Sequence, residues 1–149
     1  MGLFVEDLLN FSHLLDKEIE FLLTKEHLSN ILNGLEIELS ESFIAISGKK
    51  RGFLGSKKFE VRLAPLENSV KKEAETGRQI LCFKALTPSS LKFLPDSFEK
   101  IGENVCLDIM PAVSQTGLYQ SIPQKLRPKL TISRYRLSDS LKVYFKFEK

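Results

Sequence analysis

The end of the chain alternates strictly between apolar and polar side chains. In residues 140–147 the apolar set points one way and the polar set the other: Leu141, Val143, Phe145 and Phe147 against Lys142, Tyr144 and Lys146. This period of two predicts a β-strand with one buried face. Residues 128–137 show a similar pattern, and Ser138, Asp139 and Ser140 between the two runs are typical turn residues. The sequence therefore predicts a C-terminal antiparallel hairpin that needs an apolar cover.

Residues 91–122 provide the expected cover. Apolar residues recur there at steps of three or four, which is the spacing of one helical stripe: Leu94, Phe98, Ile101, Val105 and Ile109, then Val113, Leu118 and Ile122. Pro111 removes a helical hydrogen bond, so a kink is expected at that point. The prediction is a long, kinked amphipathic helix that packs on the sheet.

A second helical pattern opens the chain. Its stripe consists of Phe4, Leu8, Phe11, Leu15, Ile19 and Leu22. The helix is expected to pack on the domain's own sheet, with a membrane surface or a partner protein as the alternative. Thr24 is a good N-cap for a further short helix that reaches Leu32, and Asn33 with Gly34 is a typical stop.

Four segments in the middle of the chain read as strands, namely residues 35–39, 43–46, 59–63 and 79–86, with a polar connection over 67–77. Turns rather than helices join the first strands, which favours a meander. The predicted fold class is α+β, a curved antiparallel β-meander wrapped on the long kinked amphipathic helix, with an N-terminal helix. One domain is expected over residues 1–149, with a helical segment at 1–33 and the sheet and central helix at 35–148.

Composition narrows the class of protein only slightly. The 149 residues carry a net charge of +3, and they include eleven Phe and no Trp. No run of about twenty apolar residues could cross a bilayer as a helix. The first residues lack the features of a signal peptide, so the chain as written is expected in the cytoplasm, or outside it if a targeting segment has been removed. Cys82 and Cys106 are predicted to be buried free thiols rather than a disulfide.

The sequence offers little chemistry. His13 and His27 have no ligand at metal-binding spacing, and no nucleophile has a base nearby. We therefore expect no metal site, no cofactor, no catalytic residue and no enzymatic activity. Gly52 and Gly55 beside Lys49, Lys50 and Arg51 look like a GxxG clamp for nucleic-acid backbone, but that clamp needs flanking helices and the flanks here read as strands. A plain basic hairpin is expected, and nucleic-acid binding is not.

The order of these elements, closing with IPQKLRPKLTISRYRLSDSLKVYFKF at residues 122–147, resembles the bacterial branch of the tubular lipid-binding (TULIP) superfamily. The pairing of Leu130-Thr-Ile132 with Leu141-Lys-Val143, and the start at Leu23-Thr-Lys-Glu-His-Leu28, carry the likeness. The resemblance implies a long helix wrapped by a curved sheet, with a hydrophobic groove between them that receives acyl chains. It implies no catalytic residue.

The predicted function is therefore non-enzymatic binding of a lipid or another hydrophobic ligand. The residues expected to line the groove are Phe98, Ile101, Val105 and Ile109 from the helix and Val143 and Phe145 from the last strand. Apolar side chains without hydrogen-bond demands suit an alkyl tail. The alternative is a structural or protein-interaction module with a dry core, including a homodimer formed through edge strands and the N-terminal helix.

Overall fold

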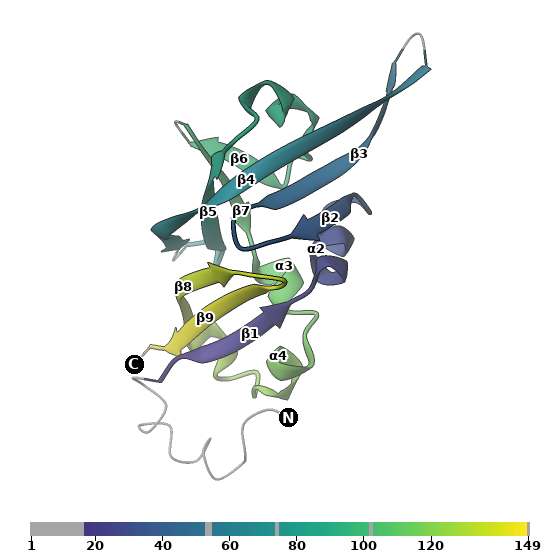
Figure 1. Ribbon diagram of the computed structural model, residues 1–149. Coiled ribbons are helices and arrows are strands. Elements are labelled where there is room, and N and C mark those ends of the chain that lie inside the picture. Colours follow the sequence, from purple (N-terminus) through teal and green to yellow (C-terminus); the bar gives the residue numbers. More distant parts are fainter. Residues whose placement is uncertain (1–16, 53–54, 74, 102, 149) are drawn as a thin grey trace.

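Two antiparallel sheets share one hydrophobic core in the computed structural model, which describes residues 17–52, 55–73, 75–101 and 103–148 (Figure 1). The smaller sheet has the order β1-β9-β8 and the larger one the order β2-β3-β4-β5-β7-β6. The strands are β1 (Ile19–Leu23), β2 (Glu36–Leu39), β3 (Ile44–Gly52), β4 (Gly55–Lys72), β5 (Gln79–Ala85), β6 (Phe98–Ile101), β7 (Asn104–Asp108), β8 (Leu130–Leu137) and β9 (Leu141–Phe147). The short helices are α2 (Lys25–Ile31), η2 (Pro88–Phe93), α3 (Met110–Val113), α4 (Gly117–Ser121) and η3 (Arg127–Lys129).

The C-terminal hairpin is confirmed. β8 and β9 pair antiparallel around the turn at residues 138–140, with Leu137 opposite Leu141. The alternating apolar residues of β9 are all buried, and Val143 and Phe145 are 0% exposed. Local alternation was a sufficient signal here, because the two strands are adjacent in sequence.

The long kinked helix is wrong, and with it the predicted α+β class. Residues 91–122 form the end of η2, the hairpin of β6 and β7, and the one-turn helices α3 and α4. The chain is mostly β, and α2 is the longest described helix at seven residues. Val105, Leu107 and Ile109 also alternate at a period of two, so the run that begins at Asn104 fits a strand as well as a helical stripe. Pairing of β7 with β5 decides the choice.

The N-terminal helical segment is also wrong where the structure describes it. Residues 19–23 form β1, which pairs with β9 and sets Phe21 against Phe145 with ring centroids 5.2 Å apart. Residues 1–16 of that predicted helix lie outside the described part of the chain. The short helix after it is confirmed. Thr24 is its N-cap, and its side chain accepts a hydrogen bond from the backbone N–H of His27.

The predicted meander is confirmed for β2, β3, β4 and β5, which are neighbours in the larger sheet. β4 runs on to Lys72, so the predicted polar connection at 67–77 is wrong over its first residues. A register shift between Pro65 and Val70 interrupts the pairing of β4 with β5. The β4 residues between Pro65 and Val70 therefore lie outside the register of paired residues.

Candidate functional site

The six residues predicted to line a lipid groove do not form one. Val105, Ile109, Val143 and Phe145 are fully buried in the common core, Phe98 is half-buried at its border, and Ile101 is 52% exposed. The helix that would form one wall of the groove is replaced by β6 and β7. The prediction of lipid binding thereby loses the groove from which it was argued, although the binding itself stays a prediction.

The apolar cavity that the described core residues enclose is small. A cavity of about 10 Å³ lies among Leu28, Ile37, Phe83, Phe98 and Leu141 and five further apolar side chains. A single water molecule needs roughly that much room. An acyl chain would therefore enter this part of the core only after the elements around it move apart.

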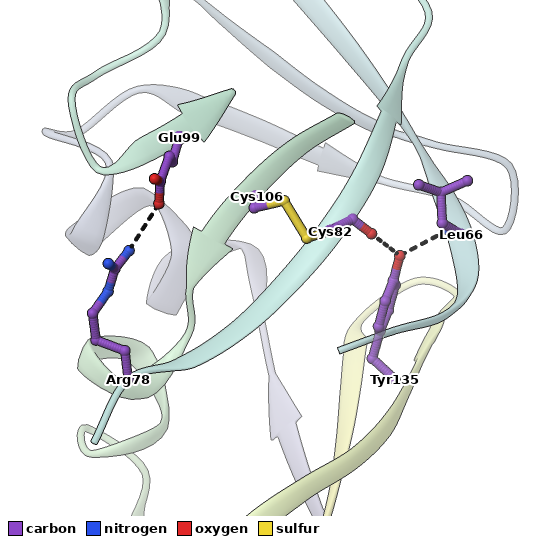
Figure 2. Close-up of a disulfide and its surroundings, with 6 residues drawn as sticks. All are labelled: Leu66, Arg78, Cys82, Glu99, Cys106 and Tyr135. Carbon is purple, nitrogen blue, oxygen red and sulfur yellow. Dashed lines mark hydrogen bonds and ion pairs between the residues drawn. A yellow bond between two sulfur atoms is a disulfide. The ribbon is translucent and has the colours of Figure 1, made fainter. Parts of the chain in front are cut away.

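Cys82 and Cys106 form a disulfide, so the predicted free thiols are wrong. The two residues stand directly opposite each other where β5 pairs with β7 (Figure 2). Their separation of 24 residues gives no sign of this contact in the sequence. Disulfides persist in oxidising compartments. The bond is therefore consistent with the second location expected from the sequence, outside the cytoplasm.

Tyr135 joins the two sheets beside this disulfide. Its hydroxyl donates a hydrogen bond of 2.7 Å to the carbonyl oxygen of Cys82 and accepts one of 2.8 Å from the N–H of Leu66 (Figure 2). Both backbone groups lie where the register of β4 and β5 shifts. Burial of the phenol raises the pKa of Tyr135 to about 12. The Tyr135 hydroxyl thus takes the place of backbone hydrogen bonds between β4 and β5 that the register shift interrupts.

Gln79 makes a second link between the sheets. Its side-chain amide nitrogen donates to the carbonyl oxygen of Leu130, and its amide oxygen accepts from the N–H of Ile132, at 3.0 and 3.1 Å. Gln79 is 3% exposed, so it acts as a buried substitute for a neighbouring strand. The hydrogen bonds of Tyr135 and Gln79 connect the two sheets. They also give the buried polar atoms of these side chains a structural role, so no catalytic or binding role is needed to explain them.

The described part of the chain contains no group of three or more His, Cys, Asp and Glu side chains placed to hold a metal ion. Its helices are all too short, or too polar, to traverse a lipid bilayer. The remaining candidates for a functional site are two surfaces, one basic and one acidic.

The first surface is a two-stranded ribbon formed by the ends of β3 and β4, which we call the basic ribbon and define as residues 48–52 and 55–59. β2 pairs with β3 only as far as Ser47, and β5 pairs with β4 only from Leu63 onward. The basic ribbon therefore has no described strand on either outer edge, and it projects beyond the rest of the sheet (Figure 1). The two strands flanking Gly52 and Gly55 confirm the predicted hairpin.

Like charges face each other across the basic ribbon. Lys49 is directly opposite Lys58, and Lys50 is opposite Lys57. Lys49, Lys57 and Lys58 are exposed, and none of these three forms an ion pair with a described carboxylate. Like charges directly opposite in an antiparallel pair destabilise it. The ribbon thus concentrates a positive charge that the fold itself does not need.

Two close contacts fix the base of the basic ribbon. The ring of Phe59 stacks on that of Phe93 from η2, with centroids 5.0 Å apart. A Cβ atom at Gly48 would lie 2.6 Å from the side chain of Leu35 and 3.1 Å from the ring of Phe59, so glycine lets both side chains pack against the strand without shifting. The ribbon consequently leaves the body of the domain at a defined place and direction.

The second surface lies where α2, β2 and the turn between β8 and β9 meet. We call it the acidic edge and define it as Glu26, Glu36, Glu38 and Asp139. All four side chains are exposed. Surface hollows of about 330 and 490 Å³ follow this edge between α2 and β2, and both are lined by Lys25, Glu26, Ile37 and Glu38. No other described strand pairs with β2 on this side, where α2 lies beside it and the Ser29 hydroxyl donates a hydrogen bond to the carbonyl oxygen of Leu35.

Comparison of the chain with protein-family models, with curated proteins and with solved structures gave no match. The resemblance to tubular lipid-binding proteins accordingly stays a prediction. Function has to be argued from the geometry of this chain.

Sequence reasoning noticed the basic residues of the ribbon but assigned them no role. The glycines between the two groups of basic residues indicated a hairpin. Which lysine lies opposite which, however, depends on the register between β3 and β4. The acidic edge was missed altogether, because Glu26, Glu38 and Asp139 come together only in the folded chain. The alternation of Glu36 and Glu38 with Ile37 was its one signal in the sequence.

Proposed function

We propose that the protein is a non-enzymatic protein-interaction module that binds an acidic protein surface through the basic ribbon. This develops the alternative considered from sequence, an interaction module with a dry core. The observation that carries the proposal is the opposition of Lys49 to Lys58 and of Lys50 to Lys57 on a ribbon without acidic residues. An anionic partner relieves the repulsion between these pairs and gains several ion pairs at once.

The distribution of charge supports the same surface. The basic ribbon contains five basic residues out of a chain with net charge +3, so the remainder of the chain has a net charge of −2. Within the basic ribbon no acidic residue offsets this charge, whereas Lys72, Arg134 and Lys142 elsewhere in the described chain form ion pairs with carboxylates. Such a concentration steers an anionic partner to one place and sets the orientation of the complex.

The disulfide supports a location outside the cytoplasm for this interaction. Cys82 and Cys106 stay paired in an oxidising compartment, whereas disulfides are rare in proteins of the reducing cytosol. We include an extracytoplasmic location in the proposal. It disfavours intracellular nucleic acid as the anionic partner.

The test uses poly-L-glutamate as a defined acidic polypeptide. Titration of the purified, disulfide-bonded protein should give binding that weakens steeply between 50 and 300 mM salt. The double substitution Lys57→Glu and Lys58→Glu should weaken binding by about tenfold or more, because it removes and reverses contact charges.

A matched control carries Lys84→Glu and Lys100→Glu, which make the same change of net charge at exposed positions of β5 and β6. This control should bind almost as well as the unchanged protein. Equal losses in both variants would mean that only the overall charge matters, and the proposal would then fail. Tighter, ribbon-dependent binding to duplex DNA than to poly-L-glutamate would assign the ribbon to nucleic acid instead.

A further inference from the structure

The direction of the β4 backbone is defined at Arg62, close to the base of the basic ribbon. The Arg62 N–H donates a hydrogen bond of 3.0 Å to the hydroxyl of Thr87. The Arg62 carbonyl oxygen accepts one of 2.8 Å from the N–H of Leu86. Both backbone groups of Arg62 therefore point away from β3, toward the side on which β5 lies.

This side of β4 is open along the basic ribbon. β3 and β4 pair without a register shift along the whole ribbon and as far as Leu63. Every second residue of such a strand directs its N–H and C=O to the same side, so Lys58 and Ser56 point the same way as Arg62. β5 ends opposite Leu63, and no other described strand pairs with residues 55–58 of β4, which we call the open edge. The open edge thus offers the N–H and C=O groups of Ser56 and Lys58 to a further strand.

The charge along the open edge is positive. Lys57 and Lys58 are neighbours in β4, and each lies opposite a further lysine of β3. Successive residues of an added strand also point alternately to the two faces, so acidic residues at successive positions meet Lys58 on one face and Lys57 on the other. Glu60, the nearest acidic residue of β4, already forms an ion pair with Arg62 at 3.4 Å.

From this arrangement we infer that the acidic partner binds as an extended segment, which adds to the basic ribbon as a third strand along the open edge. The inference rests on the proposed function and specifies the form in which the partner is recognised. Main-chain hydrogen bonds to Ser56 and Lys58 supply affinity, and carboxylates opposite Lys57 and Lys58 supply specificity. Four residues make a short contact, so binding is expected to be weak and salt-sensitive.

Two other arrangements are disfavoured. Pairing of the open edge with the same edge of a second copy would set lysine against lysine. Strand addition on the β3 side of the ribbon would bring an acidic segment close to Lys49, which lines a hollow of about 520 Å³ together with Leu35 and Glu36. That side is therefore bordered by another segment of the chain and by a carboxylate.

Fluorescence anisotropy with labelled hexaglutamate tests the inference on the unchanged protein. A second hexaglutamate, methylated at every backbone nitrogen, keeps its carboxylates but cannot donate main-chain hydrogen bonds. It should bind about fivefold more weakly or worse, which corresponds to the loss of about one hydrogen bond. Addition of the unmethylated peptide should also slow hydrogen exchange at the amides of Ser56 and Lys58.

Two matched pairs of variants locate the added strand. Lys58→Pro and Lys58→Ala have the same charge, but only the proline variant lacks the outward N–H, and proline is tolerated at such edge positions. Lys58→Pro should bind hexaglutamate about fivefold more weakly than Lys58→Ala. Lys49 lies opposite Lys58, so its N–H is on the β3 side of the ribbon. Lys49→Pro and Lys49→Ala should therefore bind alike.

Equal binding of the two hexaglutamates would overturn strand addition and leave charge-driven binding through the ribbon intact. Unchanged hydrogen exchange at Ser56 and Lys58 in the bound protein would do the same without any variant. A loss confined to the Lys49 pair would contradict the assignment to the open edge. Absence of binding to both hexaglutamate and poly-L-glutamate would instead refute the proposed function, and this inference with it.

Discussion

Tyr135 shows how one side chain can repair a defect in a sheet. Its hydroxyl takes up the Leu66 N–H and the Cys82 carbonyl at the register shift of β4 and β5. Burial holds its pKa at about 12, above the value of about 10 expected in the unfolded chain. The fold therefore favours the neutral phenol, and its stabilising contribution is complete below about pH 10 and is lost as the pH rises toward 12.

The raised pKa of Tyr135 predicts how the stability of the domain changes at alkaline pH. The free energy of unfolding should fall between about pH 10 and 12, and the fall should be smaller in the Tyr135→Phe variant, measured by urea denaturation at several pH values. Tyr135→Phe should also lower stability at pH 7 by about 1 to 3 kcal/mol, because two backbone groups lose their partner. Tyr119→Phe is the control, because the Tyr119 hydroxyl takes no part in the hydrogen bonds at the register shift. A pH dependence identical in the Tyr135→Phe variant would contradict this assignment.

Burial of single residues could be predicted from sequence where the pattern was local. Phe145 was assigned to the core from its alternation with Tyr144 and Lys146, and it is 0% exposed. Tyr135 and Gln79 could not be assigned, because their partners lie about fifty or more residues away in the chain. Their polar atoms give no periodic signal, and only the packing of two sheets defines their roles.

Among the elements, the hairpin of β6 and β7 illustrates why the helix prediction was wrong. Phe98, Ile101, Val105 and Ile109 satisfy helical spacing, but Asn104 to Asp108 is also rich in residues that favour strands. Short apolar runs of this kind fit both patterns. The antiparallel pairing of β7 with β5, joined by the disulfide, resolved the ambiguity through contacts that no local window contains.

The disulfide is expected to stabilise this pair of strands. Closing a loop of this length in the unfolded chain corresponds to about 3 kcal/mol in the chain-entropy account. Urea denaturation with and without reductant should show a loss of that order for the unchanged protein. The variant with Cys82→Ala and Cys106→Ala should give the same curve in both conditions. Two free thiols in the denatured, unreduced protein would show that the bond does not form.

On the scale of the whole molecule, a compact two-sheet body carries a charged projection. The apolar cavity described in the core measures about 10 Å³, and Glu36 at the start of β2 lies next to the base of the basic ribbon. The basic half of this candidate site was visible in the sequence as a run of lysines. The position of these lysines relative to Glu36 and Glu38 could not be predicted, because it depends on the register of β2, β3 and β4.

The most direct test of the central claim measures binding and stability together in the Lys58→Glu variant. If the lysines serve a partner and not the fold, this change should weaken binding to poly-L-glutamate several-fold. It should leave the free energy of unfolding unchanged or raise it by a few tenths of a kcal/mol, since Lys49 gains an opposite charge across the ribbon. Unchanged binding, or a loss of stability that accounts for the weaker binding, would contradict the assignment of the basic ribbon as the contact surface.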